Sequence, residues 1–379
     1  MPAAVMIIDS HVYCFEPADS PAGYASGEEH LKWVQASQAY HHQPAFRIRD
    51  RAPGPSDILD PDGRSDIANL PDLNFRINHA RGRVVWEWQG EEYTKHFYPP
   101  NLRSCEFTAM SLNGEMDYAD VDVALIHTNP MMGRGEGYVA YLSSCVERFP
   151  KRLRCMAPVD EYRVLTETDA VVAELDRAIS HHGLHAVKFC PSLAYMAGDT
   201  PWDDGPFRPF WEAVVAHKVP VFFTLGSGPS EFRKAPESEQ RRGYLEELRL
   251  LMRWMERYPD AVCSITHGFP YRIFLEGKLV LPDEVWEPFR GKNCNMEVCF
   301  PVRLGDVFDF PYREVWPVLE SMVEHIGADH LLWGTDMPFQ NRFCTYRQSR
   351  QWIEKYCEFL TAADRAAIMG GTAARILQL

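Results

Sequence analysis

The sequence predicts a (β/α)₈ TIM barrel, an α/β fold, in a single domain spanning residues 1–379. From residue 121 onward, short β-rich runs alternate with helical stretches, which implies parallel strands joined by helices. Together with an apolar strand near the N-terminus, these runs make eight, the number that closes such a barrel. The runner-up, a doubly wound open sheet, is disfavoured because no Gly-rich phosphate-binding turn follows the first strand.

The first strand is the apolar run Val5–Tyr13. The other seven are short, β-rich runs: Val121–His127, Leu153–Val159, His185–Cys190, Val219–Leu225, Ala261–His267, Cys294–Cys299 and His330–Asp336. Between them, five segments combine helical spacing with helix start signals: Ala170–Ser180, Phe210–His217, Glu237–Tyr258, Pro311–Ile326 and Gln348–Leu360.

A long insertion interrupts this rhythm between the first and second strands, where more than 100 residues intervene. Within it, Gly82–Phe97 has the alternation of a β-hairpin that turns at Gln89-Gly90. The stretch 36–80 is rich in Pro, Asp, Arg and His. Because the chain leaves from the C-terminal end of the first strand, we predict that residues 36–105 cap the mouth of the barrel.

Composition narrows the class of protein. A hydrophobic content of 46% supports a large core, and no apolar run approaches the roughly 20 residues that a membrane span needs. The ten scattered cysteines form no CxxC pair and follow no signal peptide, so we expect reduced thiols and a cytoplasmic location. A net charge of -14 argues against a nucleic-acid partner. The expected partner is a small anionic molecule held by local arginines.

Polar side chains end three of the predicted strands. Asp9, His11 and Tyr13 are spaced two residues apart, so they share one face of the first strand. His267 ends the sixth strand, and Asp336 follows the apolar run of the eighth. Barrel enzymes assemble their sites from the C-terminal ends of several strands. We therefore predict that His11, His267 and Asp336 are catalytic; the structural alternatives are a satisfied core histidine, a loop cap and a paired carboxylate.

Further basic residues are candidates for binding an anionic substrate. Lys188 and Cys190 share a face of the fourth strand; the lysine is a candidate carboxylate ligand or a salt-bridged residue, and the cysteine is expected to be an inert buried side chain. In the insertion, Arg47, Arg49 and Arg51 alternate, a pattern that fits either a substrate-facing row or a solvated edge. We retain Lys188, Arg47 and Arg49 as predicted substrate-binding residues.

A set of short motifs, in order along the chain, carries a family resemblance. They are Ile-Asp-Ser-His at the first strand, Met116-Asp-Tyr-Ala-Asp-Val-Asp-Val-Ala-Leu before the second, Ala186-Val-Lys-Phe at the fourth, Thr266-His-Gly at the sixth, Trp-Gly-Thr-Asp-Met-Pro-Phe at the eighth, and a closing Gly370-Gly-Thr-Ala-Ala-Arg-Ile-Leu377. Together they resemble the amidohydrolase superfamily. More narrowly, they are similar to its amidohydrolase-related (amidohydrolase 2) branch, which holds aminocarboxymuconate semialdehyde decarboxylase, resorcylate-type decarboxylases, a pyrone dicarboxylate lactonase and oxalomesaconate hydratase.

The resemblance implies a centre built from a His-x-His pair on the first strand, a His on the fifth, a base His on the sixth and an Asp on the eighth. The matching positions here are His11, His267 and Asp336. Tyr13 replaces the second His of the pair, and Thr224 stands where the fifth-strand ligand would fall. Both are expected to face the substrate, although neither is an ordinary substitute for an imidazole ligand of zinc.

Two cofactor states are therefore compatible with this sequence. One has no cofactor; the other has one divalent metal, Zn or Mn, held by His11 and Asp336 with weak help from Asp9. The metal-free lactonase-like members become the nearer comparison for a chain that lacks two of the four implied ligands.

The predicted function is hydrolysis of an ester, a lactone or an activated C–C bond in a small aromatic-derived carboxylic acid. In this mechanism Asp336 activates water while His267 and His11 assist. The first alternative is a metal-dependent decarboxylase of an aromatic or muconate-type acid. The second is a non-catalytic barrel that binds a small ligand. The sequence leaves the oligomeric state open; a homodimer is one candidate, because related barrels often dimerise.

Overall fold

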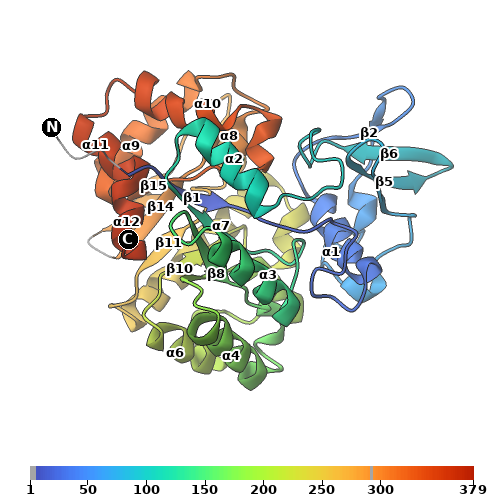
Figure 1. Cartoon of the computed structure of the whole chain (residues 1–379), viewed down its shortest axis with the longest axis horizontal. Coiled ribbons are helices and arrows are strands. Elements are labelled where there is room, and N and C mark those ends of the chain that lie inside the picture. Colours follow the sequence, from blue (N-terminus) through green and yellow to red (C-terminus); the bar gives the residue numbers. More distant parts are fainter. Residues whose placement is uncertain (1–5, 291–292) are drawn as a thin grey trace.

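The computed structural model describes residues 6–290 and 293–379, and its core is one eight-stranded parallel sheet (Figure 1). The strands follow one another around the sheet in the order β1-β7-β8-β9-β10-β11-β14-β15. Their bounds are β1 Ile8–Val12, β7 Val123–Ile126, β8 Leu153–Ala157, β9 Ala186–Phe189, β10 Val221–Phe223, β11 Cys263–Ile265, β14 Cys294–Val298 and β15 Leu331–Trp333. Each lies within a range predicted from the sequence; Val5, at the start of the first range, is outside the described residues.

The last strand returns to the first, which closes the sheet. Just beyond β15, the backbone N–H of Asp336 donates to the carbonyl of His11 at 2.8 Å. The N–H of Tyr13 donates to the carbonyl of Met337, also at 2.8 Å, and Val12 forms a parallel bridge with Met337. The predicted (β/α)₈ barrel is therefore confirmed, and the same closing bonds bring the ends of β1 and β15 together.

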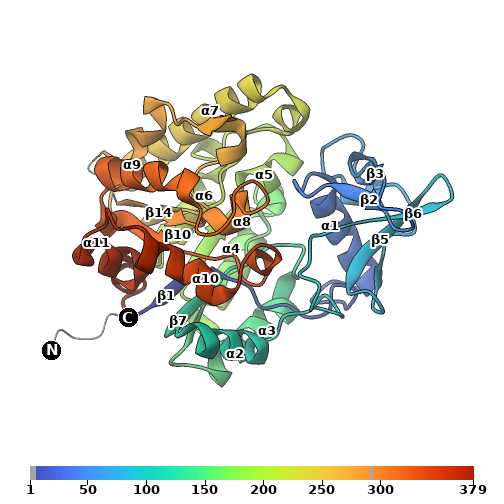
Figure 2. The same ribbon diagram turned by 90° about the horizontal axis from the view of Figure 1, so that it is seen from above.

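Helices surround the barrel (Figure 2). Those that follow the strands are α2 Ala109–Ala119, α3 Gly135–Arg148, α4 Thr168–Asp176, α5 Pro191–Ala194, α6 Arg208–Ala216, α7 Glu237–Arg257, α8 Phe300–Leu304, α9 Trp316–Ile326, α10 Tyr346–Gln351, α11 Ala362–Ala366 and α12 Thr372–Leu377. Four of the five predicted helical segments coincide with α4, α6, α7 and α9, and the fifth begins as α10 and continues as a π-helical turn at Trp352–Tyr356. The helix α9 begins only at Trp316, with Pro317 in its first turn, where a missing N–H costs nothing.

A small apolar core fills the barrel below the site. It consists of alternate strand residues that face inward: Ile8, Val123, Leu125, Met156, Ala186, Phe222 and Leu332. Side chains of α12, Ala373, Ile376 and Leu377, pack against this cluster and belong to the same core. The polar groups of the site therefore sit above a dry, packed layer.

The insertion after β1 forms a subdomain beside the barrel (Figures 1 and 2). It holds α1 Gly27–Ala39 and a five-stranded antiparallel sheet of order β3-β2-β6-β5-β4. Its strands are β2 Ala45–Arg47, β3 Pro53–Gly54, β4 Arg76–Asn78, β5 Arg83–Trp88 and β6 Glu91–Lys95.

The predicted hairpin within the insertion is confirmed. The strands β5 and β6 pair across Gln89 and Gly90, whose φ angles of 51° and 75° suit a tight turn of the mirror-image type. The three other strands of this sheet are only two or three residues long, too short to leave a periodic pattern in the sequence.

The helices give no evidence that the chain spans a membrane. Within the described ranges, none combines the length and the apolar character that crossing a bilayer requires.

Candidate active site

Three strand ends bring His11, His267 and Asp336 together. The Nε2 atom of His267 lies 3.2 Å from Oδ1 of Asp336, and Nε2 of His11 lies 3.3 Å from the same oxygen. The two imidazole rings have centroids 4.4 Å apart. His11 is fully buried, whereas His267 and Asp336 keep some exposure toward a cavity. The structure thus joins the three predicted catalytic residues in one cluster at the C-terminal ends of β1, β11 and β15.

The backbone at two of these residues is unusual. His267 and Asp336 have φ angles of 62° and 64°, the left-handed region that residues with a side chain seldom adopt. At Asp336 this conformation is held by the hydrogen bond that its backbone N–H donates to the carbonyl of His11. Such local strain persists where the surroundings impose it, and it concentrates at functional sites. Here it turns both side chains toward His11.

Glu297, on β14, ties the two histidines together and was not predicted as a site residue. Its Oε2 lies 2.8 Å from Nδ1 of His11 and accepts the backbone N–H of His267 at 2.7 Å. Burial raises the pKa of this carboxyl to about 7, although the neighbouring His267 opposes the shift. The available signal was a lone carboxylate between Met296 and Val298 in a strand expected to be buried, where unpaired charge is rare.

His127, just after β7, is a second site residue that the sequence analysis missed. Its ring stacks on that of His11 with centroids 3.5 Å apart. The Nε2–H donates to the carbonyl of Ser10 at 2.8 Å, and Nε2 also lies 3.5 Å from Oε1 of Glu297. Neither Nδ1 of His127 nor Oε1 of Glu297 has a hydrogen-bond partner among the described residues, although both are buried. His127 therefore forms the floor beneath His11.

Asp9 does not join the cluster, and the expectation of a metal-ligating role is wrong. Its Oδ1 accepts the N–H groups of His11 and Thr335, and its Oδ2 accepts the hydroxyls of Thr335 and Tyr346. The pairing of β1 with β7 is irregular between Asp9 and Val12, so simple alternation does not hold there. Asp9 links β1 to the loop after β15 and to α10, with both oxygens occupied.

Tyr13 and Lys188 continue the hydrogen-bond chain that begins at His11. The Tyr13 hydroxyl is 3.1 Å from Nε2 of His11 and accepts a hydrogen bond from Nζ of Lys188 at 3.0 Å. Tyr13 lines the cavity, but Lys188, which is 3% exposed, lies behind it and does not. Lys188 instead borders a small hollow that it shares with Glu161 and Cys190.

Thr224 lies one step away from the cavity. Its hydroxyl is 2.7 Å from that of Thr266, the residue before His267. It is absent from the residues that line the cavity, so the structure places it in a position to support the β11 end through Thr266.

Arg47 and Arg49 do not reach the site, so their predicted substrate-binding role is a second correction. Arg47 pairs with Asp50 at 2.6 Å, and Arg49, 63% exposed, pairs with Glu91 at 2.9 Å. Both guanidinium groups lie on the surface of the insertion. The alternation expected along a strand does not apply, because β2 ends at Arg47 and Arg49 lies in the turn that follows it.

The cavity above the cluster has a volume of about 180 Å³. Residues of the insertion form one wall, and the loops after the barrel strands form the others; the lining is Tyr13, His41, His42, Phe97, Asn129, Met131, Met132, His267, Val302, Arg303, Asp336, Phe339 and Arg342. A cavity of roughly 150 Å³ is enough for benzene. The space therefore suits a molecule with a single ring.

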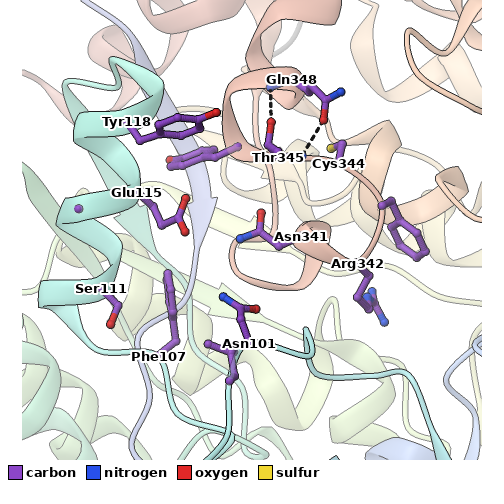
Figure 3. A pocket seen from close by; sticks show the side chains of 14 residues that line it. Asn101, Phe107, Ser111, Glu115, Tyr118, Asn341, Arg342, Cys344, Thr345 and Gln348 are labelled. Atoms are coloured by element: carbon purple, nitrogen blue, oxygen red, sulfur yellow. Dashed lines mark hydrogen bonds between the residues drawn. The ribbon is translucent and has the colours of Figure 1, made fainter. Parts of the chain in front are cut away.

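A larger groove, of about 940 Å³, lies elsewhere, between α2 and the loop after β15. In Figure 3 the side chains of Asn101, Glu115 and Asn341 face one another across it, while Arg342 points away from them. None of His11, His267 or Asp336 lines this groove. Size alone therefore does not identify the site, and the smaller cavity holds the reactive groups.

His11 and Asp336 have different charges at neutral pH, because their surroundings shift their pKa values. Burial lowers the pKa of His11 well below its ordinary value, and nearby cationic groups lower it further. Burial alone would raise the pKa of Asp336, but the hydrogen bond with His267 and the surrounding charges outweigh it and lower that pKa. The site thus combines a neutral imidazole with an ionised carboxylate at neutral pH, the pairing that acid–base chemistry needs.

The same cluster has the donor set of a divalent metal site. His11, His267 and Asp336 offer two imidazole nitrogens and a carboxylate oxygen, and His11, His127 and Glu297 form a second, fully buried group. Zinc–ligand bonds of 2.0–2.2 Å in a tetrahedron put neighbouring ligand atoms roughly 3.4 Å apart. The separations of 3.3 and 3.2 Å from Oδ1 of Asp336 fit this geometry. The Glu297 contact would orient His11 as carboxylates orient metal-bound histidines.

A comparison with protein families finds one match. The model described as amidohydrolase matches residues 131–379. A search of curated proteins finds no match.

Comparison with solved structures finds barrels of the same fold. The 5-carboxyvanillate decarboxylase from Sphingomonas paucimobilis is 16% identical, with a TM-score of 0.56 over 99% of this chain and 100% of that one. A probable 2-pyrone-4,6-dicarboxylic acid hydrolase from Acinetobacter baumannii is 15% identical, with a TM-score of 0.52 over 72% and 90%. A dihydroxybenzoic acid decarboxylase from Polaromonas sp. JS666, with bound manganese and 2-nitroresorcinol, is 20% identical, with a TM-score of 0.52 over 74% and 89%. At these identities the likeness concerns the fold.

Proposed function

This chain belongs to the amidohydrolase family, and on that basis we propose that it is a hydrolase of a small aromatic-derived carboxylic acid. The bond cleaved is an ester, a lactone or an activated C–C bond. One observation carries the proposal: the ionised carboxylate of Asp336 lies at the cavity between His267 and His11, at 3.2 and 3.3 Å. A base in that position can take a proton from water above the barrel.

In the hydrolysis of an ester or a lactone, Asp336 and His267 have different roles. Asp336 accepts a proton from water as the water oxygen attacks the carbonyl carbon. His267, which lines the cavity, shares the Nε2–H that it directs at Asp336 with the carbonyl oxygen as that oxygen gains negative charge. As the carbon–oxygen bond to the leaving group breaks, Asp336 returns the proton to that oxygen and regains its charge.

His11 and Glu297 position this machinery. Glu297 accepts the Nδ1–H of His11 and the backbone N–H of His267, so it fixes the ring of His11 and the backbone of His267. Tyr13 offers a hydroxyl at the cavity, held by Lys188. The name of one structural neighbour, a probable 2-pyrone-4,6-dicarboxylic acid hydrolase, supports a substrate of this type.

The second candidate is decarboxylation of an aromatic acid. The observation in its favour is the fit of His11, His267 and Asp336 to one divalent ion. When bound, such an ion would supply positive charge for a substrate carboxylate and an adjacent oxygen. Two of the three structural neighbours described above are named as decarboxylases, and one of these two holds manganese.

A substrate panel separates the two reactions. The purified protein would be assayed on pyrone and benzoate-derived lactones and esters, and in parallel on hydroxybenzoic acids, with carboxylic acid product and released CO₂ measured in the same samples. Hydrolysis without CO₂ release supports the proposal. CO₂ release without hydrolysis would transfer the assignment to the decarboxylase.

A further inference from the structure

The cavity contains a guanidinium group that has no acidic partner. Arg303, on α8, is mostly buried and lines the cavity together with Asp336 and His267. Across residues 6–290 and 293–379, no hydrogen bond or ion pair joins Arg303 to another side chain or to the backbone. The fork of donors is instead open to the cavity, since none of its nitrogens is among the buried, unpaired atoms.

Burying a charged group without a partner is costly, and proteins rarely do it without a functional reason. The neighbouring arginine shows the contrast. Arg272 forms an ion pair with Asp306 near the same end of the barrel. Among the residues that the structure describes, no carboxylate contacts Arg303 directly, although the charge of Asp336 on the same cavity acts on it, so its donors are free to bind an anion that enters.

A second guanidinium faces the same space. Arg342 donates to Nε2 of His41 at 3.1 Å and to the carbonyl of Phe339 at 2.8 Å, both uncharged acceptors. It lies over the rings of Phe97 and Phe339, which form an aromatic wall of the cavity. Its charge is therefore also uncompensated by a direct carboxylate contact in the described residues.

The histidines between these two arginines do not add charge. Burial and the nearby arginines keep the pKa of both His41 and His42 well below the ordinary value, so both rings are neutral. Buried Nε2 of His42 has no partner among the described residues. The insertion thus contributes hydrogen-bonding groups beside two fixed positive charges.

We propose that Arg303, flanked by Arg342, binds a substrate carboxylate that does not react. This inference rests on the proposed function, because it places the reacting carbonyl at Asp336 and His267 and the retained carboxylate at the two arginines that line the same cavity. A guanidinium fork matches a carboxylate with two parallel hydrogen bonds. With a volume of about 180 Å³, the cavity has room for one ring. The substrate class is therefore a single-ring acid with a reactive group and a separate carboxylate.

The test measures binding, not turnover, with benzoate and its neutral isostere benzamide as probes. Titration calorimetry on the full chain should give tighter binding of benzoate than of benzamide. In Arg303→Gln, benzoate binding should weaken roughly 10- to 100-fold, as expected for loss of a buried charge-assisted hydrogen bond, while benzamide binding stays the same. Arg208→Gln is the matched control, because Arg208 is half exposed and pairs with Asp204 on the surface.

Three results would overturn the inference: no preference for benzoate in the wild type, unchanged benzoate binding in Arg303→Gln, or equal weakening of both probes. Arg303→Lys keeps the charge without the fork and should bind benzoate with intermediate affinity; it also serves if the Gln variant does not fold. Because no probe turns over, these results are separate from the reaction. If the protein prefers benzoate but hydrolyses no substrate, the proposed function is contradicted and this inference stands. If the protein hydrolyses a substrate but shows no preference for benzoate, this inference is contradicted and the proposed function stands.

Discussion

Nδ1 of His11 lies 2.8 Å from Oε2 of Glu297, so two strands that are far apart in sequence, β1 and β14, share one buried hydrogen bond. The same oxygen also accepts a hydrogen bond from the backbone N–H of His267, at 2.7 Å. His11 therefore carries its proton on Nδ1, and its unprotonated Nε2 accepts a hydrogen bond from the Tyr13 hydroxyl at 3.1 Å. One carboxylate fixes the tautomer of one histidine and the backbone of the other.

Replacement of Glu297 should impair the chemistry more than the fold. In Glu297→Gln, the amide N–H₂ faces groups that are themselves donors, so His11 loses its defined tautomer. We expect kcat to fall roughly 10- to 100-fold, the usual effect of removing such an orienting partner, with a smaller change in KM. Steady-state kinetics on a substrate from the panel would measure both.

The control for this variant is a second buried glutamate far from the site. Glu247 on α7 is 1% exposed and accepts hydrogen bonds from Tyr195 and Trp202. Glu247→Gln should keep wild-type turnover. Equal loss in both variants would mean that Glu297 matters only for stability.

Glu247 also gives a stability prediction with a defined sign. Burial raises its pKa from 4.5 to about 7 in the folded protein. The folded state therefore holds the proton more tightly than the unfolded chain, and this stabilising contribution is complete below pH 4.5 and lost as pH rises toward 7. The loss is about 1.4 kcal/mol per pH unit, up to about 3 kcal/mol over the window.

Urea unfolding of wild type and Glu247→Gln at pH 5 and pH 8 would measure the effect. The variant should gain free energy of unfolding relative to wild type as pH increases, because glutamine has no proton to lose. A difference between the two proteins that is the same at both pH values would show that Glu247 keeps an ordinary pKa.

Asp336 should be the most sensitive position for turnover. Asp336→Asn keeps the shape of the side chain and one oxygen but cannot accept a proton from water. We expect kcat to fall by roughly 10²- to 10⁴-fold, with circular dichroism unchanged. Activity near that of wild type would assign the carboxylate a structural role.

The barrel could be predicted because its signals are local. Each strand is a short apolar run between turn or helix signals, and the polar ends of β1, β11 and β15 stand out against those runs. The hairpin was equally visible, since Gln89-Gly90 supplies the turn that its strands need. Patterns of this kind depend on neighbours in the sequence, and the fold preserves them.

The rest of the site depends on contacts between distant strands. Glu297 is only a lone carboxylate in a buried strand, and His127 carries no signal, until β14 and β7 bring them to His11; Arg303 belongs to no motif. The arginine prediction failed for the same reason: Arg49 was expected to hold an anion, but it lies in the turn after β2 and pairs with Glu91 of β6. Asp9 was misread because the irregular pairing after it breaks the alternation that placed it beside His11.

The central claim is that Asp336, His267 and His11 act as an acid–base set, and removal of metal tests it most directly. The purified protein would be dialysed against a strong chelator, its metal content measured, and its hydrolytic rate compared with that of the untreated protein. The account predicts a hydrolytic rate that survives dialysis, since water activation depends on the carboxylate of Asp336. Loss of activity on dialysis, restored by one equivalent of Zn²⁺ or Mn²⁺ together with release of CO₂ from a hydroxybenzoic acid, would contradict it.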